Sequence, residues 1–281
     1  MDGTDSLNRS RSMEPFFFGP TQHRLFGVYH PPKAAVERPV GVVLCHAFGQ
    51  EYIRRHRALR QLAVILAGEG FHTLRFDLRG CGDSSGCRTE GTLADWVGDI
   101  GVAVEELFSG SGAERMCLIG VRLGASLALR FSAEQGDVDK LVLWDPIVEG
   151  KAYVEELAVQ HAVWLRGSFA RPQMDGQGRA MTERLGFPLS DALIAELTEL
   201  DFRSVAQKPA RHVLVVDSGP EPAAQPLVDA LRARDCRVEH QHMPSLGDSI
   251  KATGGQGDVD ENLVPVDVLQ RMTTWLTEGE S

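Results

Sequence analysis

The sequence predicts an α/β domain in which a mainly parallel sheet is covered by helices on both faces. Two observations predict this fold class. Continuous apolar runs, typical of strands that are buried on both faces, recur along the chain. Between them lie segments whose apolar residues recur at helical spacing. Strands that alternate with helices imply right-handed crossover connections, which place a parallel sheet between two helical layers.

Eight predicted strands make up the sheet. They cover residues 16–18, 24–30, 39–46, 71–78, 115–120, 140–145, 211–217 and 236–243. The first two are short and suit a hairpin. By contrast, the runs PVGVVLCH at 39–46, KLVLWD at 140–145 and RHVLVVD at 211–217 are largely apolar, as expected of central strands.

Five predicted helices pack on this sheet. They lie around residues 59–66, 93–107, 124–133, 227–234 and 264–276. In the first, Leu59, Leu62 and Leu66 share one helical face, and Gly68 ends the pattern. The second has an apolar residue at every third or fourth position, which is the spacing of a helix packed against a core.

The alternation breaks between residues 150 and 206. This stretch has few strand signals and contains amphipathic helical pieces at 153–165 and 189–200. The sequence therefore predicts a helical cap at 150–206, inserted into an α/β core formed by 14–149 and 207–278. Residues 1–13 are polar and lack the apolar segment of a secretory signal, so we expect a disordered N-terminal segment.

Composition excludes several classes of function. The chain has 281 residues and a net charge of −10, which argues against nucleic-acid binding because phosphate contacts need clustered Lys and Arg. No apolar run reaches the roughly 20 residues that span a bilayer. The five cysteines show neither the paired spacing of a disulfide framework nor a C-x-x-C metal motif. This usage is typical of proteins in a reducing compartment. We expect a cytoplasmic protein with no metal and no cofactor.

Arg122 is the most informative residue. A strand-like apolar run enters Gly120, and a small-residue helical run leaves Gly124. This is the layout of the G-x-S-x-G nucleophile elbow, a strand-to-helix turn that exposes a catalytic serine. Arg122 stands where the serine should be. Arginine stays protonated and offers hydrogen-bond donors but no nucleophile.

Three further segments carry a family resemblance. They are CHAFG at 45–49, FDLRGCGDS at 76–84 and the strand and loop at 213–221. In this order, together with the elbow, they resemble the α/β-hydrolases of the serine aminopeptidase-like (S33-type) group over nearly the whole chain. The closer likeness is to a poorly characterised bacterial subset with arginine at the elbow, some of whose members are linked to exosortase systems.

The resemblance implies a ligand site around the elbow. His46, Ala47 and Phe48 match the loop whose backbone supplies one oxyanion-hole N–H, and Leu123 follows the nucleophile position. The further expected ligand contacts are Gln50, Glu51 and Trp144. Two interpretations of Glu51 stay open: an acid or base over the site, or a solvated residue that favours the positive end of a helix. We favour the second.

The positions of the catalytic acid and histidine are less clear. Asp217, Glu221 and Asp145 all lie at or after strand ends at the carboxyl edge of the sheet, where ligands bind in open α/β folds. The resemblance places Asp248 where the family has its histidine. His240 and His242 lie on the preceding strand, where a histidine with a structural partner is the more common case.

Ser126 is a weak substitute for the missing nucleophile. It lies one helical turn after the elbow, where its hydroxyl is expected to bond back to the carbonyl of Arg122.

Arg122 itself has two interpretations. It either forms an ion pair with one or more of the surrounding acids, or binds an anionic ligand group together with the positive helix end. We favour the ion pair. The acids considered are Asp145, Asp217, Glu221 and Asp248.

Three functions follow from this sequence. The first is a hydrolase-like binding protein or pseudoenzyme with a pocket for a small-molecule or peptide-like ligand, and Arg122 suits an anionic one. The second is a non-hydrolytic isomerase, lyase or cyclase that uses a carboxylate or histidine base. The third is an esterase, thioesterase or peptidase with a non-standard site. We favour them in that order.

Overall fold

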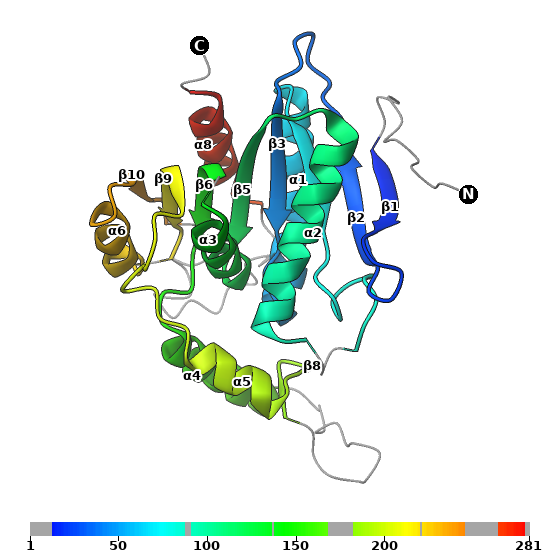
Figure 1. Ribbon diagram of the computed structural model, residues 1–281. Helices are drawn as coiled ribbons and strands as arrows, with labels where there is room; N and C mark the ends of the chain where they lie inside the picture. Colours follow the sequence, from blue (N-terminus) through cyan, green and yellow to red (C-terminus); the bar gives the residue numbers. More distant parts are fainter. Residues whose placement is uncertain are drawn as a thin grey trace.

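An eight-stranded, mostly parallel sheet forms the centre of the molecule (Figure 1). The computed structural model describes residues 13–87, 91–136, 138–167, 182–219, 221–244 and 264–278. In sheet order the strands are β1 (Glu14–Phe18), β2 (Leu25–His30), β4 (His72–Phe76), β3 (Val40–Cys45), β5 (Arg115–Val121), β6 (Val138–Trp144), β9 (Ala210–Asp217) and β10 (Arg237–His242). Among the described strands of this sheet, antiparallel pairing is confined to β1 with β2 and β2 with β4. The predicted fold class and the opening hairpin are therefore confirmed.

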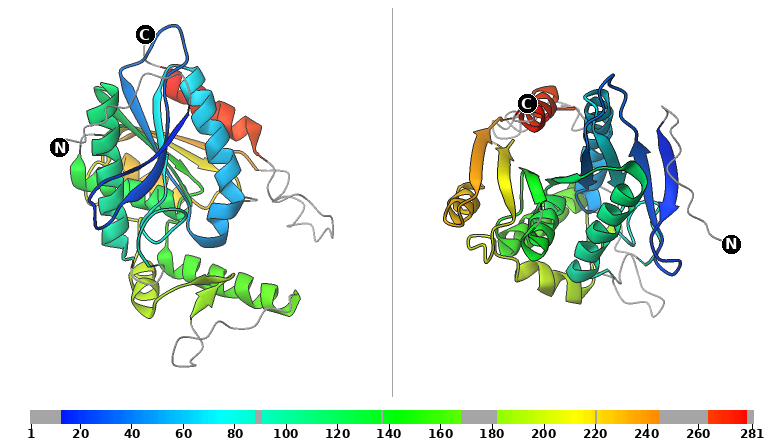
Figure 2. Two further views of the ribbon diagram at one scale, coloured as in Figure 1. Left: turned by 90° about the vertical axis from the view of Figure 1, so that its right-hand side faces the viewer. Right: turned by 45° about the horizontal axis from the view of Figure 1, so that its top comes forward.

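Helices cover both faces of the sheet (Figures 1 and 2). The core helices are α1 (Gly49–Gly68), α2 (Leu93–Ser111), α3 (Leu123–Gln135), α6 (Gln225–Arg232) and α8 (Val266–Thr277). Side chains alternate between the two faces along each strand. Leu118 packs in the layer with α2 and α3, whereas its neighbour Ile119 packs in the layer with α1 and α8. Alternation of this kind explains why the central strands read as continuous apolar runs.

A group of short elements lies at one end of the sheet, between β6 and β9 in the chain (Figures 1 and 2). It comprises α4 (Gly150–Gly167), β7 (Glu183–Arg184), β8 (Phe187–Pro188) and α5 (Asp191–Thr198). We call these four elements the cap, as the sequence analysis did for residues 150–206. Within the described ranges, no helix combines the length and the apolar character that crossing a bilayer requires. The expected N-terminal segment lies outside the described residues except for Met13.

Close packing fixes the turn between β5 and α3. A Cβ added at Gly124 would lie 2.3 Å from the carbonyl oxygen of His46, and one added at Gly120 would lie 2.4 Å from the Cα of Ala125. Neither distance is compatible with a real side chain. The two glycines therefore let α3 start against the loop that follows β3.

This packing yields a stability prediction. Gly124→Ala should lower the free energy of unfolding by about 1–3 kcal/mol, because the new methyl group overpacks a rigid backbone contact. The matched control is Gly98→Ala in α2, where nothing lies within 4 Å of the added Cβ. That exchange should raise the free energy of unfolding by about 0.5–1 kcal/mol, since alanine favours a helix. Urea unfolding measures both. Equal stability of Gly124→Ala and the native protein would contradict the packing argument.

Candidate functional site

Arg122 lies at the turn from β5 to α3, as the motif predicts. Its backbone has φ 53° and ψ −123°, outside the regions that residues with a side chain normally adopt. Strained backbone of this kind is concentrated at functional sites, and surrounding packing must hold it in place. The elbow conformation is thus present in this chain, with an arginine side chain projecting from it.

Two carboxylates hold the guanidinium of Arg122. Its Nε donates to Oε1 of Glu51 at 2.5 Å, and its Nη2 donates to Oε2 of Glu156 at 2.9 Å. The guanidinium carbon lies 5.5 Å from the centroid of the Tyr153 ring, and the Tyr153 hydroxyl donates to the second oxygen of Glu51 at 2.9 Å. Glu51 comes from α1, whereas Tyr153 and Glu156 come from α4. The cluster therefore joins the cap to the core.

The cluster keeps Arg122 charged. Burial alone lowers the pKa of its guanidinium, but the charges of Glu51 and Glu156 outweigh burial and raise that pKa. Burial and the charge of Glu51 raise the pKa of the Tyr153 phenol well above its usual value. At neutral pH the Arg122 guanidinium is therefore charged and the Tyr153 phenol is neutral.

Asp145 and Asp217, two of the acids expected around Arg122, have other hydrogen-bond partners. Asp145 accepts hydrogen bonds from the backbone N–H of Ser218 at 2.6 Å and from Nη2 of Arg55 at 3.3 Å, and burial raises the pKa of its carboxyl. Asp217 lies 2.6 Å from Nε2 of His240. Glu221 is exposed, and Asp248 lies outside the described residues.

The contribution of the cap to this cluster could not be predicted from the sequence. Glu156 and Tyr153 lie 34 and 31 positions after Arg122 in the chain, on a helix whose sequence gives no sign of pairing with the elbow. The sequence pattern favours Glu51 as a solvated residue at the N-terminal end of a helix. It does lie in the first turn of α1, but its carboxylate also faces Arg122.

Ser126 is buried beneath the elbow and has a structural role. Its hydroxyl donates to the carbonyl of Ile147 at 2.8 Å and accepts from the N–H of the same residue at 3.0 Å. The expected bond to the carbonyl of Arg122 is present but long, at 3.5 Å. Ser126 therefore joins α3 to the segment between β6 and α4.

The histidines near the site divide into two groups. His242 is exposed, and its Nε2 lies 2.9 Å from the carbonyl oxygen of Gly219. His46 is buried beside Tyr52 and His56, and burial lowers the pKa of its imidazole to about 3. His46 is therefore neutral in the folded protein and braces the loop after β3.

Trp144 lies away from the expected pocket. Its side chain has no exposed area and packs in the layer with α1 and α8. The cause is its register on β6, since Trp144 points to the same face as Val142. Of the other expected contacts, Leu123, Ala47 and Phe48 are buried and Gln50 is partly exposed.

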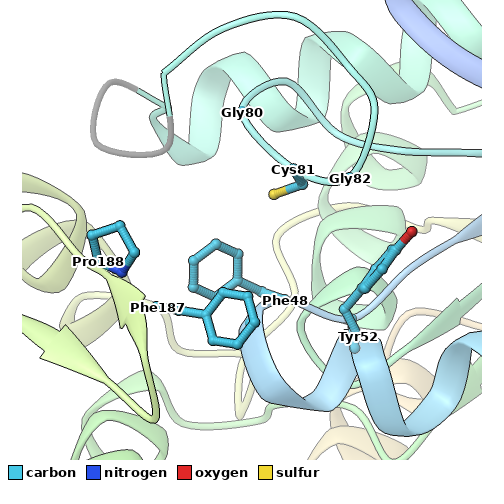
Figure 3. A pocket seen from close by; sticks show the side chains of 9 residues that line it. Phe48, Tyr52, Gly80, Cys81, Gly82, Phe187 and Pro188 are labelled. Atoms are coloured by element: carbon cyan, nitrogen blue, oxygen red, sulfur yellow. The ribbon is translucent and has the colours of Figure 1, made fainter. Parts of the chain in front are cut away.

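A small apolar pocket separates the cap from the core (Figure 3). It encloses about 370 Å³ of empty space. The lining residues are Ala47, Phe48, Gly49, Tyr52, Gly80, Cys81, Gly82, Phe187 and Pro188. The rings of Phe48 and Phe187 stand edge to face, with centroids 6.5 Å apart. Gly49 and Tyr52 flank Glu51 in the sequence, so the pocket and the elbow cluster both use the first turn of α1. Among the described residues, no three His, Cys, Asp or Glu side chains form a group that could hold a metal ion.

The unequal burial of the two carboxylates yields a prediction. Glu51→Gln should lower the free energy of unfolding by about 1–3 kcal/mol, because it leaves a mostly buried guanidinium with one counter-ion. Glu156 is 46% exposed against 13% for Glu51, so Glu156→Gln should cost less than about 1 kcal/mol. Glu134→Gln, in an exposed pair with Arg130, is the control. Urea unfolding ranks the three variants, and a larger loss for Glu156→Gln than for Glu51→Gln would refute the ranking.

Comparisons with known proteins agree with this fold. The model of the family "serine aminopeptidase, S33" matches residues 38–211. The structure of the esterase Est1E from Butyrivibrio proteoclasticus with ferulic acid is 18% identical, has a TM-score of 0.61 and covers 93% of this chain and 99% of its own. A carboxyl esterase from Bacillus coagulans is 12% identical, with a TM-score of 0.64 and coverages of 95% and 98%. A putative hydrolase from Agrobacterium vitis is 19% identical, with a TM-score of 0.59 and coverages of 95% and 98%.

No curated protein sequence matches. Because the family model spans more than half of the chain, this protein belongs to the S33 serine aminopeptidase family of α/β-hydrolases.

Proposed function

We propose that this protein binds a small ligand beneath the cap and does not perform serine-triad hydrolysis. One observation carries the proposal: the elbow position is occupied by Arg122, whose guanidinium is held by Glu51 and Glu156. A covalent mechanism requires a nucleophile at this point, activated by a neighbouring base. A guanidinium supplies neither function, because it has no lone pair to give at physiological pH.

The surroundings of the elbow support this proposal. Ser126, the nearest alternative hydroxyl, is buried and bonded in both directions to Ile147. The resemblance puts Asp248 in the place of the catalytic histidine. Asp217, in the acid region, is paired with His240. The changes around Arg122 are therefore consistent with a site rebuilt around an ion pair.

The ligand that suits this site has an apolar group and an anionic group. The apolar group fits the pocket between Phe48 and Phe187. The anionic group takes the place of the Glu156 carboxylate on Arg122, since Glu156 is the more exposed of the two counter-ions. A carboxylate suits the planar donor fork of arginine. The cysteines form no disulfide, in keeping with the cytoplasmic location that we propose.

A second candidate function is acid–base catalysis without a covalent intermediate. The observation that favours it is the bond from the Tyr153 hydroxyl to Glu51 at 2.9 Å. A neutral phenol beside a carboxylate provides a proton donor and a proton acceptor next to a cationic anchor. Such a set of groups suits isomerisation or elimination, which need no nucleophile.

Labelling with a fluorophosphonate probe tests the proposal. We expect no covalent adduct on the native protein and no hydrolysis of p-nitrophenyl butyrate. The Ser126→Ala variant serves as the control for background labelling. An adduct on Ser126, detected by mass spectrometry and lost in that variant, would overturn the proposal.

Ligand binding at Arg122 is tested separately. Thermal shifts against a panel of small aromatic and aliphatic carboxylic acids should identify stabilising compounds, because a ligand that binds only the folded state raises the melting temperature. Arg122→Ala should abolish the shift, whereas Glu156→Gln should retain or increase it. A shift that survives Arg122→Ala unchanged would remove Arg122 from the ligand site.

A further inference from the structure

A second cavity lies between α1 and the outer strands of the sheet. It is open to solvent and comprises about 780 Å³ of space between these elements. Pro15, Phe26 and Val28 of the β1–β2 hairpin supply apolar side chains. On the other side, α1 contributes residues spaced by four positions, which share one helical face. These are Tyr52, His56 and Arg60.

Two guanidinium groups line this groove without a carboxylate counter-ion. Within the part of the chain that the structure describes, no ion pair joins Arg60 or Arg75 to an Asp or Glu side chain. Arg75 instead donates from Nε to Nε2 of His30 at 3.2 Å, and its Nη1 lies 3.4 Å from Nε2 of His56. An arginine N–H needs an acceptor, so these contacts suit neutral imidazoles that present a lone pair.

Burial and nearby arginine charges both lower the pKa values of the neighbouring histidines. Burial, followed by the charges of Arg75, Lys33 and Arg60, lowers the pKa of His30 to about 4. Burial and the charge of Arg75 also lower the pKa of His56, partly offset by Asp77. The charge of Arg75 thus acts on both histidines, and the charge of Asp77 partly offsets it at His56.

Two acids stand at one end of the groove. Asp77 accepts a hydrogen bond from the Tyr52 hydroxyl at 2.8 Å and one from the N–H of Asp83 at 3.1 Å. Asp83 is exposed. The carboxylate of Asp77 is therefore engaged with its own loop and with α1, which leaves the guanidiniums of Arg60 and Arg75 for an incoming anion.

We propose that this groove binds an amphipathic anion, with its carboxylate between Arg60, Arg75 and His56 and its apolar chain along the β1–β2 hairpin. Arg60 and Arg75 select the head group, because neither forms an ion pair with a carboxylate among the described residues, although Asp77 and Asp83 line the same groove. The apolar side chains of Pro15, Phe26 and Val28 favour a ligand with an apolar chain. This site is separate from the elbow and does not depend on the function proposed there.

Calorimetric titration with sodium octanoate tests the proposal, with n-octylamine as the probe of the same chain length and opposite charge. The titration is made with the Arg122→Ala variant, in which the elbow has lost its cationic anchor, so that only the groove is tested. We expect saturable binding of one octanoate per chain of this variant and at least about tenfold weaker binding of octylamine. Arg60→Gln and Arg75→Gln should each weaken octanoate binding about tenfold. Arg60 is exposed, so its variant keeps the test valid if the Arg75 variant fails to fold.

A control variant and a double variant complete the experiment. Arg57→Gln removes an exposed charge from α1 outside the groove and should leave the octanoate affinity unchanged. Within the Arg122→Ala background, Arg60→Gln should still weaken the remaining octanoate binding about tenfold, which assigns that binding to the groove and not to the elbow. The proposal is overturned if octanoate fails to bind to the Arg122→Ala variant, if octylamine binds equally well, or if Arg60→Gln leaves the octanoate affinity of that variant unchanged.

Discussion

The contact between the β5–α3 turn and the loop after β3 is the constraint on which the site depends. Gly120 and Gly124 let two stretches of backbone approach too closely for side chains, and this packing holds residue 122 at φ 53°. In a hydrolase this geometry presents a nucleophile. Here the same geometry projects a guanidinium from the carboxyl edge of the sheet toward the cap. The scaffold determines where the side chain lies, while the residue type determines what chemistry is available there.

A cation at this point requires compensation, because a guanidinium withdrawn from water is costly without partners. Two elements far apart in the chain supply it. Glu51 from α1 is largely buried and also accepts from Tyr153, so it forms the fixed half of the cluster. Glu156 from α4 is the more exposed of the two. The ion pairs of Arg122 thus also join α4 of the cap to the core.

Most of the fold could be predicted from the sequence, because burial on both faces leaves continuous apolar runs and helices leave a period near 3.6. The position of Arg122 followed from the two glycines beside it. Its partners did not, since an ion pair between residues 34 or 71 positions apart leaves no periodic signal. Trp144 shows another limit. In a strand with apolar residues on both faces, composition does not reveal which face a side chain takes, and register places Trp144 in the layer of α1.

Helix α1 links the two proposed sites through its geometry. Glu51 faces the elbow, while Tyr52, His56 and Arg60, spaced by one helical turn, face the groove beside β2. One rigid element therefore forms a wall of both sites. Sharing a wall does not by itself make the sites cooperative, because a ligand shifts an equilibrium only by the difference in its affinity for two states. Coupling would require α1 to occupy two positions that differ in both the Glu51–Arg122 distance and the spacing of Arg60 from Arg75. If α1 moved in this way, Glu51 would move with it, whereas Glu156 would stay with α4. The two ion pairs of Arg122 would therefore respond differently.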